Sequence, residues 1–461
     1  MTGKQAVNTR VKTFMTYQEA YEYFDSLHNL PREYKGKGNW QNTPTIIRGV
    51  RLMLKMAGSP ELKIPHYIHV TGTSGKGSVS MMMSQILKAQ GFKVGLVTSP
   101  HPTKITERWQ INNESMSERD FVEMVTDLKP IWDNYIHSAN YTFPSMVSLN
   151  TIIALYYFAK RKVDYAVLEV TCGGKNDGTN VIPYKDVAII TNIGLDHISI
   201  LGSTKEQITE NKSGIITKGC NVFTAEHNPK LVKIMATTAS KKKAFSFKEV
   251  ETDRYGDKRG TVIKQDWAGT DFKIDGDTYH LNNLGYHQID NAKVAIEAAK
   301  KLGIGVAAIK TGLRETEFPI RFEVVSDRPH IILDGAHNAD KVKATILGIK
   351  NLHKKYKNLH LLIGFSDNKD HSTFLKELLT LKPKSLACTR FTKNIFRKTA
   401  DPKKLMNSAL KIDTKLVAAS FLDPLAALAW SRKQAKSDDL ILVTGSMFLA
   451  GELRPIFKKI K

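Results

Sequence analysis

A glycine-rich turn between an apolar run and a helical segment constrains this 461-residue chain more than any other feature. It reads Gly72, Thr73, Ser74, Gly75, Lys76, Gly77, Ser78, after the apolar run 67–70 and before the helical pattern 78–90. Glycines let consecutive backbone N–H groups point into one concavity, where an anion also meets the positive end of the helix dipole. Lys76 can reach the β and γ phosphates of a nucleotide, and the Ser78 hydroxyl can bind phosphate or Mg²⁺. The turn therefore predicts a phosphate site, although Gly77 between Lys76 and Ser78 departs from the usual G-x-x-x-x-G-K-[ST] spacing.

Short apolar runs alternate with helical segments along the chain, which predicts a parallel α/β sheet. Gly91 is expected to end the helix 78–90 in the left-handed conformation. The polar segment 245–280 predicts a hairpin outside the sheet, and a further helix is expected at 290–302. Strands of the first sheet are expected at residues 67–70, 93–98, 165–170 and 187–192.

A second α/β unit is expected after a linker at residues 312–320. Its predicted strands are residues 330–333, 360–363, 385–389 and 440–443. The predicted fold is α/β, with a parallel-sheet ATPase domain of the P-loop type followed by a smaller Rossmann-like α/β domain. The domains are assigned to residues 1–311, which include an N-terminal helical segment, and to residues 321–461.

Composition excludes several classes of protein. The chain is 41% hydrophobic and 25% charged without a low-complexity tract, which excludes a mainly disordered protein. Apolar runs such as 440–443 are too short to span a membrane, and the first residues lack the apolar segment of a secretory signal. Three widely spaced cysteines without a CxxC pair suit a reducing cytosol, so a cytoplasmic location is expected.

The formal net charge of +23 raises nucleic acid, a membrane surface or an anionic small molecule as partners. Residues 321–461 hold 27 Lys and Arg against 13 Asp and Glu, a surplus of 14, while residues 1–320 hold the other 9. The basic runs are dominated by lysine and have no interleaved aromatic residues. This pattern favours a solvated basic surface over a nucleic-acid interface.

Three polar residues lie at or just beyond the carboxyl ends of predicted strands, where open α/β sheets place their ligands. They are Ser99, Glu169 and His197. A hydroxyl, a carboxylate and an imidazole together can bind Mg²⁺ and phosphate oxygens. Taken singly, Ser99 also fits a turn and His197 an ordinary surface histidine. Glu169 is more informative, because an unpaired carboxylate in an apolar strand is costly to bury.

The order of these motifs resembles the folylpolyglutamate synthase/dihydrofolate synthase branch of the Mur ligase family. The resemblance covers nearly the whole chain. It rests on the turn 72–78, on Thr98-Ser99-Pro100-His101, Leu168-Glu169-Val170, Asn192-Ile193-Gly194-Leu195-Asp196-His197, Lys212-Ser213-Gly214, Leu284-Gly285-Tyr286-His287-Gln288 with Asn291, Arg321-Phe322-Glu323, Leu333-Asp334-Gly335-Ala336-His337-Asn338 and Val443-Thr444-Gly445-Ser446.

The resemblance implies an ATP-dependent amide ligase that adds L-glutamate to a reduced folate through an acyl phosphate. It implies ATP and Mg²⁺, with K⁺ as an optional second cation, and a monomer without nucleic-acid or membrane partners. Residues 72–78 would bind the ATP phosphates, with further nucleotide contacts from Asn291, Arg321, Asp334 and His337. The metal ligands would be Ser99, Glu169, His197 and Lys212, the last as a carbamate, and the catalytic set Lys76, Glu169, His197 and Lys212.

Departures from the family pattern concern the acceptor rather than ATP. Where relatives have a Gly-Leu-Gly-Gly-Arg stretch, this chain has Thr171-Cys172-Gly173-Gly174-Lys175, and Lys175 lacks the guanidinium fork. Lys175 and Asp177 are the candidates for substrate binding. Residues 145–148, residues 44–46 behind the basic loop 32–38, and Pro319-Ile320 before Arg321 also differ from the usual motifs. Polyglutamylation is therefore favoured over dihydrofolate synthesis, with both left open.

Three alternatives remain at this stage. The first is a Mur-type ligase acting on another carboxylate acceptor, such as a UDP-muramoyl precursor, although the 71 residues before Gly72 leave little room for a UDP-binding domain. The second is a basic P-loop NTPase that binds nucleic acid. The third is a binding protein without activity, which the intact set of Lys76, Glu169, His197 and Lys212 disfavours.

Overall fold

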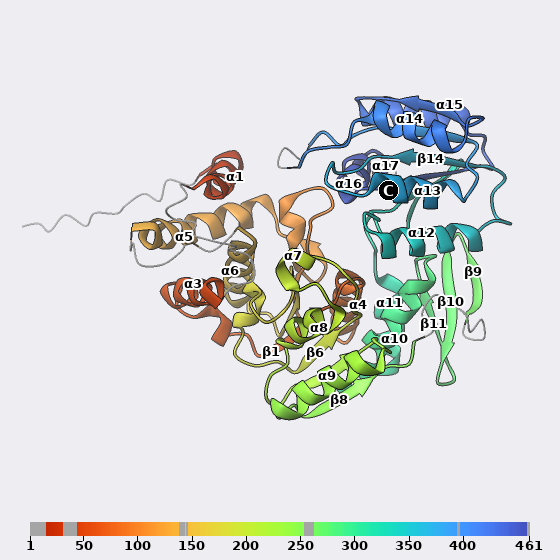
Figure 1. Ribbon diagram of the computed structural model, residues 1–461. Coiled ribbons are helices and arrows are strands. Elements are labelled where there is room, and N and C mark those ends of the chain that lie inside the picture. Colours follow the sequence, from red (N-terminus) through yellow and green to blue (C-terminus); the bar gives the residue numbers. More distant parts are fainter. Residues whose placement is uncertain are drawn as a thin grey trace, which may run out of the picture.

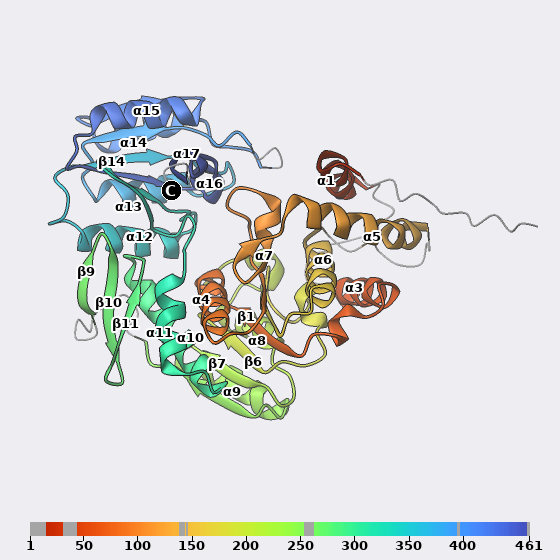
Figure 2. The same ribbon diagram turned by 180° about the vertical axis from the view of Figure 1, so that it is seen from behind.

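The computed structural model describes residues 15–30, 44–137, 143, 146–252, 262–393 and 397–458. These residues form three β-sheets, of eight, three and six strands. Figures 1 and 2 show the six-stranded sheet and its helices as one lobe, separate from the lobe of the eight-stranded sheet. Within the described ranges, no helix is long and apolar enough to cross a membrane.

The eight-stranded sheet has the order β4-β3-β2-β5-β1-β6-β7-β8. The pairs from β2 to β8 are parallel, whereas β3 and β4 add antiparallel strands at one edge. The predicted parallel α/β architecture is therefore confirmed. Its strands are β1 (His66–Thr71), β2 (Val94–Val97), β3 (Trp109–Ile111), β4 (Glu114–Ser115), β5 (Tyr165–Glu169), β6 (Val187–Ile190), β7 (Asn221–Thr224) and β8 (Ser246–Glu249).

Helices cover both faces of this sheet. One face packs on α1, α3, α5 and α6, and the other on α4, α10 and α11. The helices of this part are α1 (Tyr17–Ser26), α3 (Pro44–Met56), α4 (Lys76–Ala89), α5 (Glu118–His137), α6 (Met146–Lys160), α7 (Ile198–Leu201), α8 (Lys205–Ser213), α9 (Pro229–Lys241), α10 (Tyr286–Lys301) and α11 (Val306–Glu315).

Strand β1 is buried on both faces of the sheet. Tyr67 belongs to the core on one face, and Ile68 and Val70 belong to the core on the other. A parallel strand covered on both faces must be apolar at successive positions. The helix after β1 ends as predicted, because Gly91 has a φ of 102° just beyond α4.

The predicted hairpin at 245–280 is only partly correct. Strand β8 pairs in parallel with β7 and so belongs to the large sheet. Its edge position leaves Lys248 and Glu249 exposed, so its sequence resembles an isolated hairpin more than a sheet strand. Residues 253–261 lie outside the described residues. The separate antiparallel sheet consists of β9 (Val262–Asp266), β10 (Gly269–Ile274) and β11 (Asp277–Leu281).

The six-stranded sheet has the order β12-β13-β17-β14-β15-β16 and is parallel except for β12. The four predicted strands are confirmed, and the two edge strands β12 and β16 were not predicted. The bounds are β12 (Glu323–Asp327), β13 (His330–Leu333), β14 (Leu359–Ile363), β15 (Ser385–Cys388), β16 (Val417–Ser420) and β17 (Leu440–Thr444), with α12 (Ala339–Asn351), α13 (His371–Leu379), α14 (Pro402–Ile412), α15 (Pro424–Gln434), α16 (Met447–Leu453) and α17 (Pro455–Lys458).

The predicted linker at 312–320 begins too early, because Gly312 lies inside α11. A Cβ on Gly312 would collide with backbone atoms of Ile86 in α4, so this glycine permits two helices to approach closely. From the sequence alone, such a glycine is interpreted as the end of a helix. The division of the chain into residues 1–311, 312–320 and 321–461 otherwise stays a prediction.

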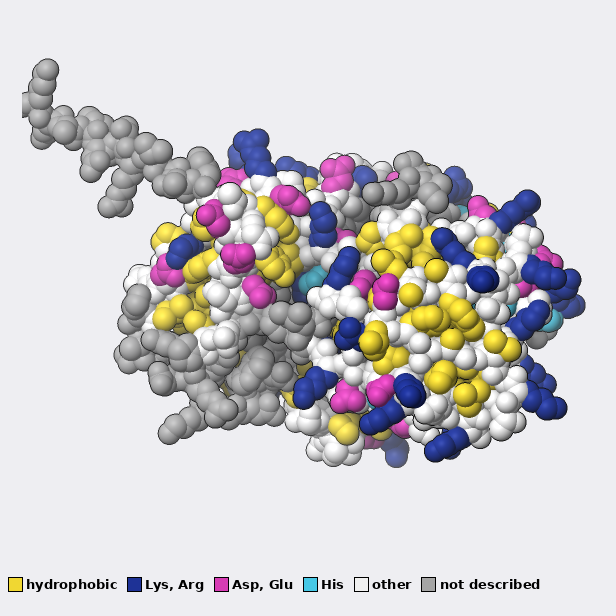
Figure 3. Space-filling view, turned by 90° about the horizontal axis from the view of Figure 1, so that it is seen from above, with side chains coloured by type: hydrophobic (Ala, Val, Ile, Leu, Met, Phe, Trp, Pro, Cys, Tyr) yellow, Lys and Arg dark blue, Asp and Glu magenta, His cyan; other side chains and the backbone are white. Residues whose placement is uncertain are grey.

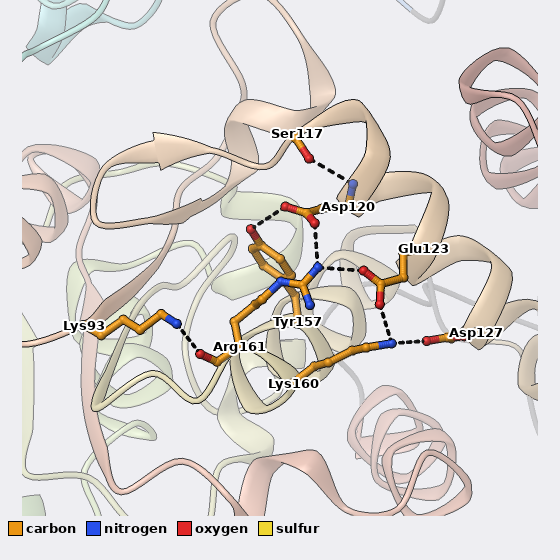
Figure 4. A network of polar contacts seen from close by, with 8 residues as sticks. All are labelled: Lys93, Ser117, Asp120, Glu123, Asp127, Tyr157, Lys160 and Arg161. Atoms are coloured by element: carbon orange, nitrogen blue, oxygen red, sulfur yellow. Dashed lines mark hydrogen bonds and ion pairs between the residues drawn. The ribbon is translucent and has the colours of Figure 1, made fainter.

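Figure 4 shows a network of ion pairs between α5 and the end of α6. The Arg161 Nη2 lies 2.6 Å from Asp120 Oδ1 and 2.6 Å from Glu123 Oε2. Lys160 Nζ lies 2.7 Å from Glu123 Oε1, and the Arg161 carbonyl accepts a hydrogen bond from Lys93 Nζ at 2.5 Å. Each half-exposed pair stabilises by about 1 kcal/mol at most. Together they fix the residues just before β5.

We expect Gly312→Ala to destabilise the protein by about 1–3 kcal/mol, because the added methyl group meets the backbone of α4. Helix propensity alone predicts the opposite sign, a gain of about 1 kcal/mol. The measurement is the free energy of unfolding by chemical denaturation. Thr311→Ala, at an exposed neighbouring position, is the matched control. A Gly312→Ala protein as stable as the parent would contradict the close helix crossing.

Candidate functional site

The predicted phosphate loop, residues 72–78, connects β1 to the first turn of α4. Gly72 and Gly75 have φ angles of 147° and 84°. A Cβ on Gly72 would overlap the Thr191 hydroxyl, and one on Gly75 would overlap the Asn291 amide. Both glycines are therefore required by conformation and by close packing. The loop has the strand–turn–helix context that its sequence predicts, with Asn291 beside it.

The segment after β6 holds this loop in place. Thr191 Oγ1 donates to the Ser74 carbonyl at 2.5 Å, and Asn192 Oδ1 accepts from the Ser74 N–H at 2.8 Å. The Thr73 hydroxyl accepts from the Gly194 N–H at 2.8 Å. Sequence reasoning missed these supporting roles. Their only signal was polar residues directly after an apolar strand.

Two lysines converge on one backbone carbonyl of the phosphate loop. Lys76 Nζ donates to the Gly72 carbonyl at 2.9 Å, and Lys212 Nζ donates to the same oxygen at 2.8 Å. Lys212 lies in the last turn of α8 and is 4% exposed. Burial, followed by the charge of Lys76, lowers the pKa of Lys212 to about 7. The Lys212 amine is therefore largely neutral above that pH.

Glu169 ends β5 below the first turn of α4. It is 4% exposed, and its Oε2 accepts from the Ser99 N–H at 2.8 Å. A Cβ built on Gly77 would lie 2.7 Å from Arg321 Nη2 and 3.3 Å from Glu169 Oε2, so both groups border this glycine. Burial raises the pKa of Glu169, while the charges of Lys76 and then Arg321 oppose that shift.

Asp196 and His197 are the more exposed members of the same site. His197 is exposed and has a φ of 50° before the short helix α7. Burial tends to raise the pKa of Asp196, but the charges of His197, Lys341 and Lys76 lower it overall. Among the described residues, no cluster of three His, Cys, Asp or Glu side chains is placed to hold a metal. The predicted ligand set thus contains one carboxylate, Glu169, with Ser99, His197 and Lys212 as its other members.

Residues of the second lobe complete the site. Arg321 reaches Gly77, and its Nη1 donates to the Pro319 carbonyl at 3.1 Å. The Asp334 carboxylate accepts from the Phe322 N–H at 2.9 Å and from the Thr345 hydroxyl at 2.7 Å. Asp334 therefore holds the segment that carries Arg321. This supporting role differs from the nucleotide contact that the resemblance implies, which stays a prediction.

A partly buried ion pair fixes the same segment from its other side. Arg454 Nε lies 2.9 Å and 2.8 Å from the two carboxylate oxygens of Glu323, and Glu323 Oε2 also accepts from the Ile320 N–H at 2.8 Å. Sequence reasoning missed Arg454, which lies 131 positions from its partner. Arg321 is thus held between two anchored neighbours.

His337 lies after β13, where the sequence analysis expects it. Its Nδ1 lies 2.7 Å from the Gly335 carbonyl, and its Nε2 lies 3.4 Å from Lys341 Nζ. Nδ1 therefore carries the proton, and Nε2 accepts from Lys341. Burial, followed by the charge of Lys341, lowers the pKa of His337 to about 3. Lys341 was not among the predicted site residues.

The two candidates for substrate binding differ in burial. Lys175 is exposed, whereas Asp177 is buried. Asp177 Oδ2 accepts from the N–H groups of Thr171 and Cys172 at 3.1 Å and 2.9 Å, and its Oδ1 accepts from the Thr179 N–H at 3.0 Å. The Thr179 hydroxyl donates to the same oxygen at 2.5 Å. Asp177 therefore organises the loop after β5.

A basic cavity of about 670 Å³ lies at the carboxyl edge of the second sheet, beyond β14 and β15. Four cationic side chains and two carboxylates, those of Asp367 and Asp401, line it. Lys369, which lies in sequence between the lining residues Asp367 and His371, acts electrostatically on both His197 and His337. The cations are Arg390, Arg397, Lys398 and Lys404.

Comparisons with known proteins agree with this geometry. The Mur ligase middle domain matches residues 70–299, and the Mur ligase glutamate ligase domain matches residues 320–447. A dihydrofolate synthase/folylpolyglutamate synthase of Bacillus subtilis is 29% identical, covering 90% of this chain and 95% of the relative. A folylpolyglutamate synthase of Lacticaseibacillus casei is 30% identical, covering 79% and 83%. The crystal structure of folylpolyglutamate synthase from Thermotoga maritima superimposes with a TM-score of 0.78 at 29% identity, covering 96% and 97%.

We expect Asp177→Ala to lower the free energy of unfolding by about 2–4 kcal/mol, because it leaves the N–H groups of Thr171 and Cys172 without their acceptor. Lys175→Ala, in the same loop but exposed, should change stability by less than about 0.5 kcal/mol. Denaturant unfolding measures both. Equal effects of the two substitutions would show that the buried carboxylate does not organise the loop.

Proposed function

The chain belongs to the folylpolyglutamate synthase/dihydrofolate synthase branch of the Mur ligase family, and on that premise we propose that it joins L-glutamate to a reduced folate with conversion of ATP to ADP and phosphate. One observation of the site carries this proposal. Glu169 of the first lobe and Arg321 of the second border Gly77, and the charges of Lys76 and Arg321 both act on the Glu169 carboxylate. Such an arrangement suits phosphoryl transfer from ATP to a carboxylate at a site that residues of both domains line.

The chemistry requires activation of a carboxylate, because its oxygen is a poor leaving group. A carboxylate oxygen of the folate attacks the γ-phosphorus of ATP, ADP leaves, and an acyl phosphate forms. The glutamate amine then attacks the acyl carbon and phosphate leaves, with loss of a proton from nitrogen. No enzyme nucleophile takes part. Catalysis of phosphoryl transfer depends mainly on positioning of the reactants and on neutralisation of phosphate charge. Lys76 and Arg321 supply two cations for this neutralisation.

Mg²⁺ is part of the proposal. The oxygen donors near the phosphate loop are of the type this ion prefers: the buried Glu169 carboxylate and the hydroxyls of Ser78 and Ser99. Glu169 has a single hydrogen bond among the described contacts, from the Ser99 N–H, which leaves carboxylate lone pairs for a cation. Bound Mg²⁺ would neutralise phosphate charge. His197 and a modified Lys212 complete the proposed ligand set.

The basic charge of the second lobe suits anionic small molecules. Seen from above, Lys and Arg side chains are scattered among apolar and acidic ones rather than arranged in a stripe (Figure 3). The cavity beyond β14 and β15 offers arginine and lysine side chains as partners for the two carboxylates of glutamate. We therefore favour glutamate and folate over nucleic acid and over a UDP-linked acceptor. The proposal includes a monomeric state and a cytoplasmic location. The three unpaired cysteines suit the reducing conditions of that compartment.

The direct test is an acceptor screen with ATP and L-glutamate. We expect ADP release together with a mass gain of one glutamyl unit on a reduced folate, and dihydropteroate serves as the second acceptor. Lys76→Ala should reduce the rate at least about a hundredfold, because it removes a cation from the transferring phosphoryl group. Its unfolding curve should match the parent. ATP hydrolysis that depends on nucleic acid, without an amide product, would contradict the proposal.

The environment of Lys212 predicts its modification. A neutral amine reacts with CO₂ to form a carbamate, and the pKa of about 7 makes that form available above neutral pH. We expect a ¹³C carbamate resonance in protein incubated with ¹³C-bicarbonate, which grows as the pH rises through about 7 and disappears as it falls. Lys212→Arg is the control without a reactive amine. Absence of the signal in the parent at pH 8.5 would contradict the assignment.

A further inference from the structure

Lys341 lies in the first turn of α12, and this helix lies on the side of the second lobe that faces the first (Figure 1). Its N–H donates to the Asn338 side chain at 3.0 Å, which fixes the start of the helix. Its half-buried side chain reaches back toward His337, with Nζ 3.4 Å from Nε2. The motif that carries the family resemblance ends at Asn338. Lys341 is therefore not among the residues for which that resemblance implies a role.

The position is electrostatically unfavourable for a cation in the absence of an anion. The N-terminus of a helix carries partial positive charge and favours acidic side chains. Lys341 also lies within electrostatic range of the cations Lys76 and Arg321, with Asp196 and Glu169 as the acidic groups in range. Burial and then the charge of Lys76 lower the pKa of Lys341 to about 8. Among the side chains that the structure describes, no carboxylate lies within ion-pair distance of it.

A polyanion between the two lobes would remove this conflict. It would pair with Lys76 on one side and with Lys341 on the other, and the N-terminus of α12 would add to the attraction. His337 fixes the direction of the ammonium group, because its Nδ1–H is engaged by the Gly335 carbonyl and its Nε2 accepts from Lys341. The amine is thus held at the cleft rather than extended into solvent.

We propose that Lys341 binds the terminal phosphates of the nucleoside triphosphate, as a cation that the second lobe supplies opposite Lys76. This inference rests on the proposed function, since it takes the phosphate loop as the nucleotide site. Lys341 then contributes more to binding of ATP than of AMP, because only the β and γ phosphates lie near Lys76 and the second lobe. It also makes tight ATP binding depend on both lobes.

Calorimetric titration of the full chain with ATP, ADP and AMP, without folate or glutamate, tests this role. We expect Lys341→Ala to weaken ATP binding about tenfold or more, the usual loss for a hydrogen bond to a charged group, and to leave AMP binding unchanged. Lys341→Arg should restore most of the affinity, because it keeps the charge. Lys343→Ala, an exposed lysine on the same helix, is the matched control.

The outcomes separate the inference from the proposed function. Equal ATP affinity of the parent and of Lys341→Ala overturns the inference, and ligation by the parent in the same preparation leaves the function standing. Loss of ATP affinity in Lys341→Ala with full recovery in Lys341→Arg supports the inference even if no folate is glutamylated. An equal loss for ATP and AMP, or for Lys343→Ala, indicates a general structural effect and overturns it.

Discussion

The arrangement of this protein depends on one electrostatic constraint, the burial of the Glu169 carboxylate under the phosphate loop. A buried carboxylate is costly unless cations and hydrogen-bond donors surround it. Here the donor is the Ser99 N–H, and the cations are Lys76 from α4 and Arg321 from the other lobe. The strand that ends in Glu169, the helix that starts at Lys76 and the connection to the second lobe are thus tied to one point. The same charges are those that a polyphosphate requires.

The second lobe contributes to the site through a short anchored segment. Arg321 is flanked by Ile320, whose N–H is bound by Glu323, and by Phe322, whose N–H is bound by Asp334. The Glu323–Arg454 pair links that segment to the end of the chain. Precise placement of a cation against a carboxylate on another lobe needs this support, because a flexible arginine would lose its binding energy to conformational entropy. The lobes also meet where the Thr103 hydroxyl donates to the Gly451 carbonyl at 3.2 Å.

Local patterns predicted the central parts of the fold, and tertiary contacts determined the rest. The phosphate loop and Gly91 follow from backbone rules that act within a few residues. The edge strands β12 and β16 were not predicted, and β8 was expected in a hairpin outside the sheet, because edge strands lack the apolar signal of central ones. Gly312 was misread because its partner, Ile86, lies far away in the sequence. At the site, motifs predicted residues that the fold brings together around Gly77, whereas Lys341 was not predicted because only the fold brings it near Lys76.

The central claim is that a folate carboxylate becomes an acyl phosphate before glutamate attacks it. The most direct measurement uses a reduced folate in which both oxygens of the terminal γ-carboxylate are ¹⁸O. It is incubated with the protein, ATP and L-glutamate. The account predicts that each amide formed releases one phosphate containing one ¹⁸O atom, detected by mass spectrometry, because the attacking carboxylate oxygen leaves with phosphorus. Phosphate free of the label, alongside an amide product, would contradict it.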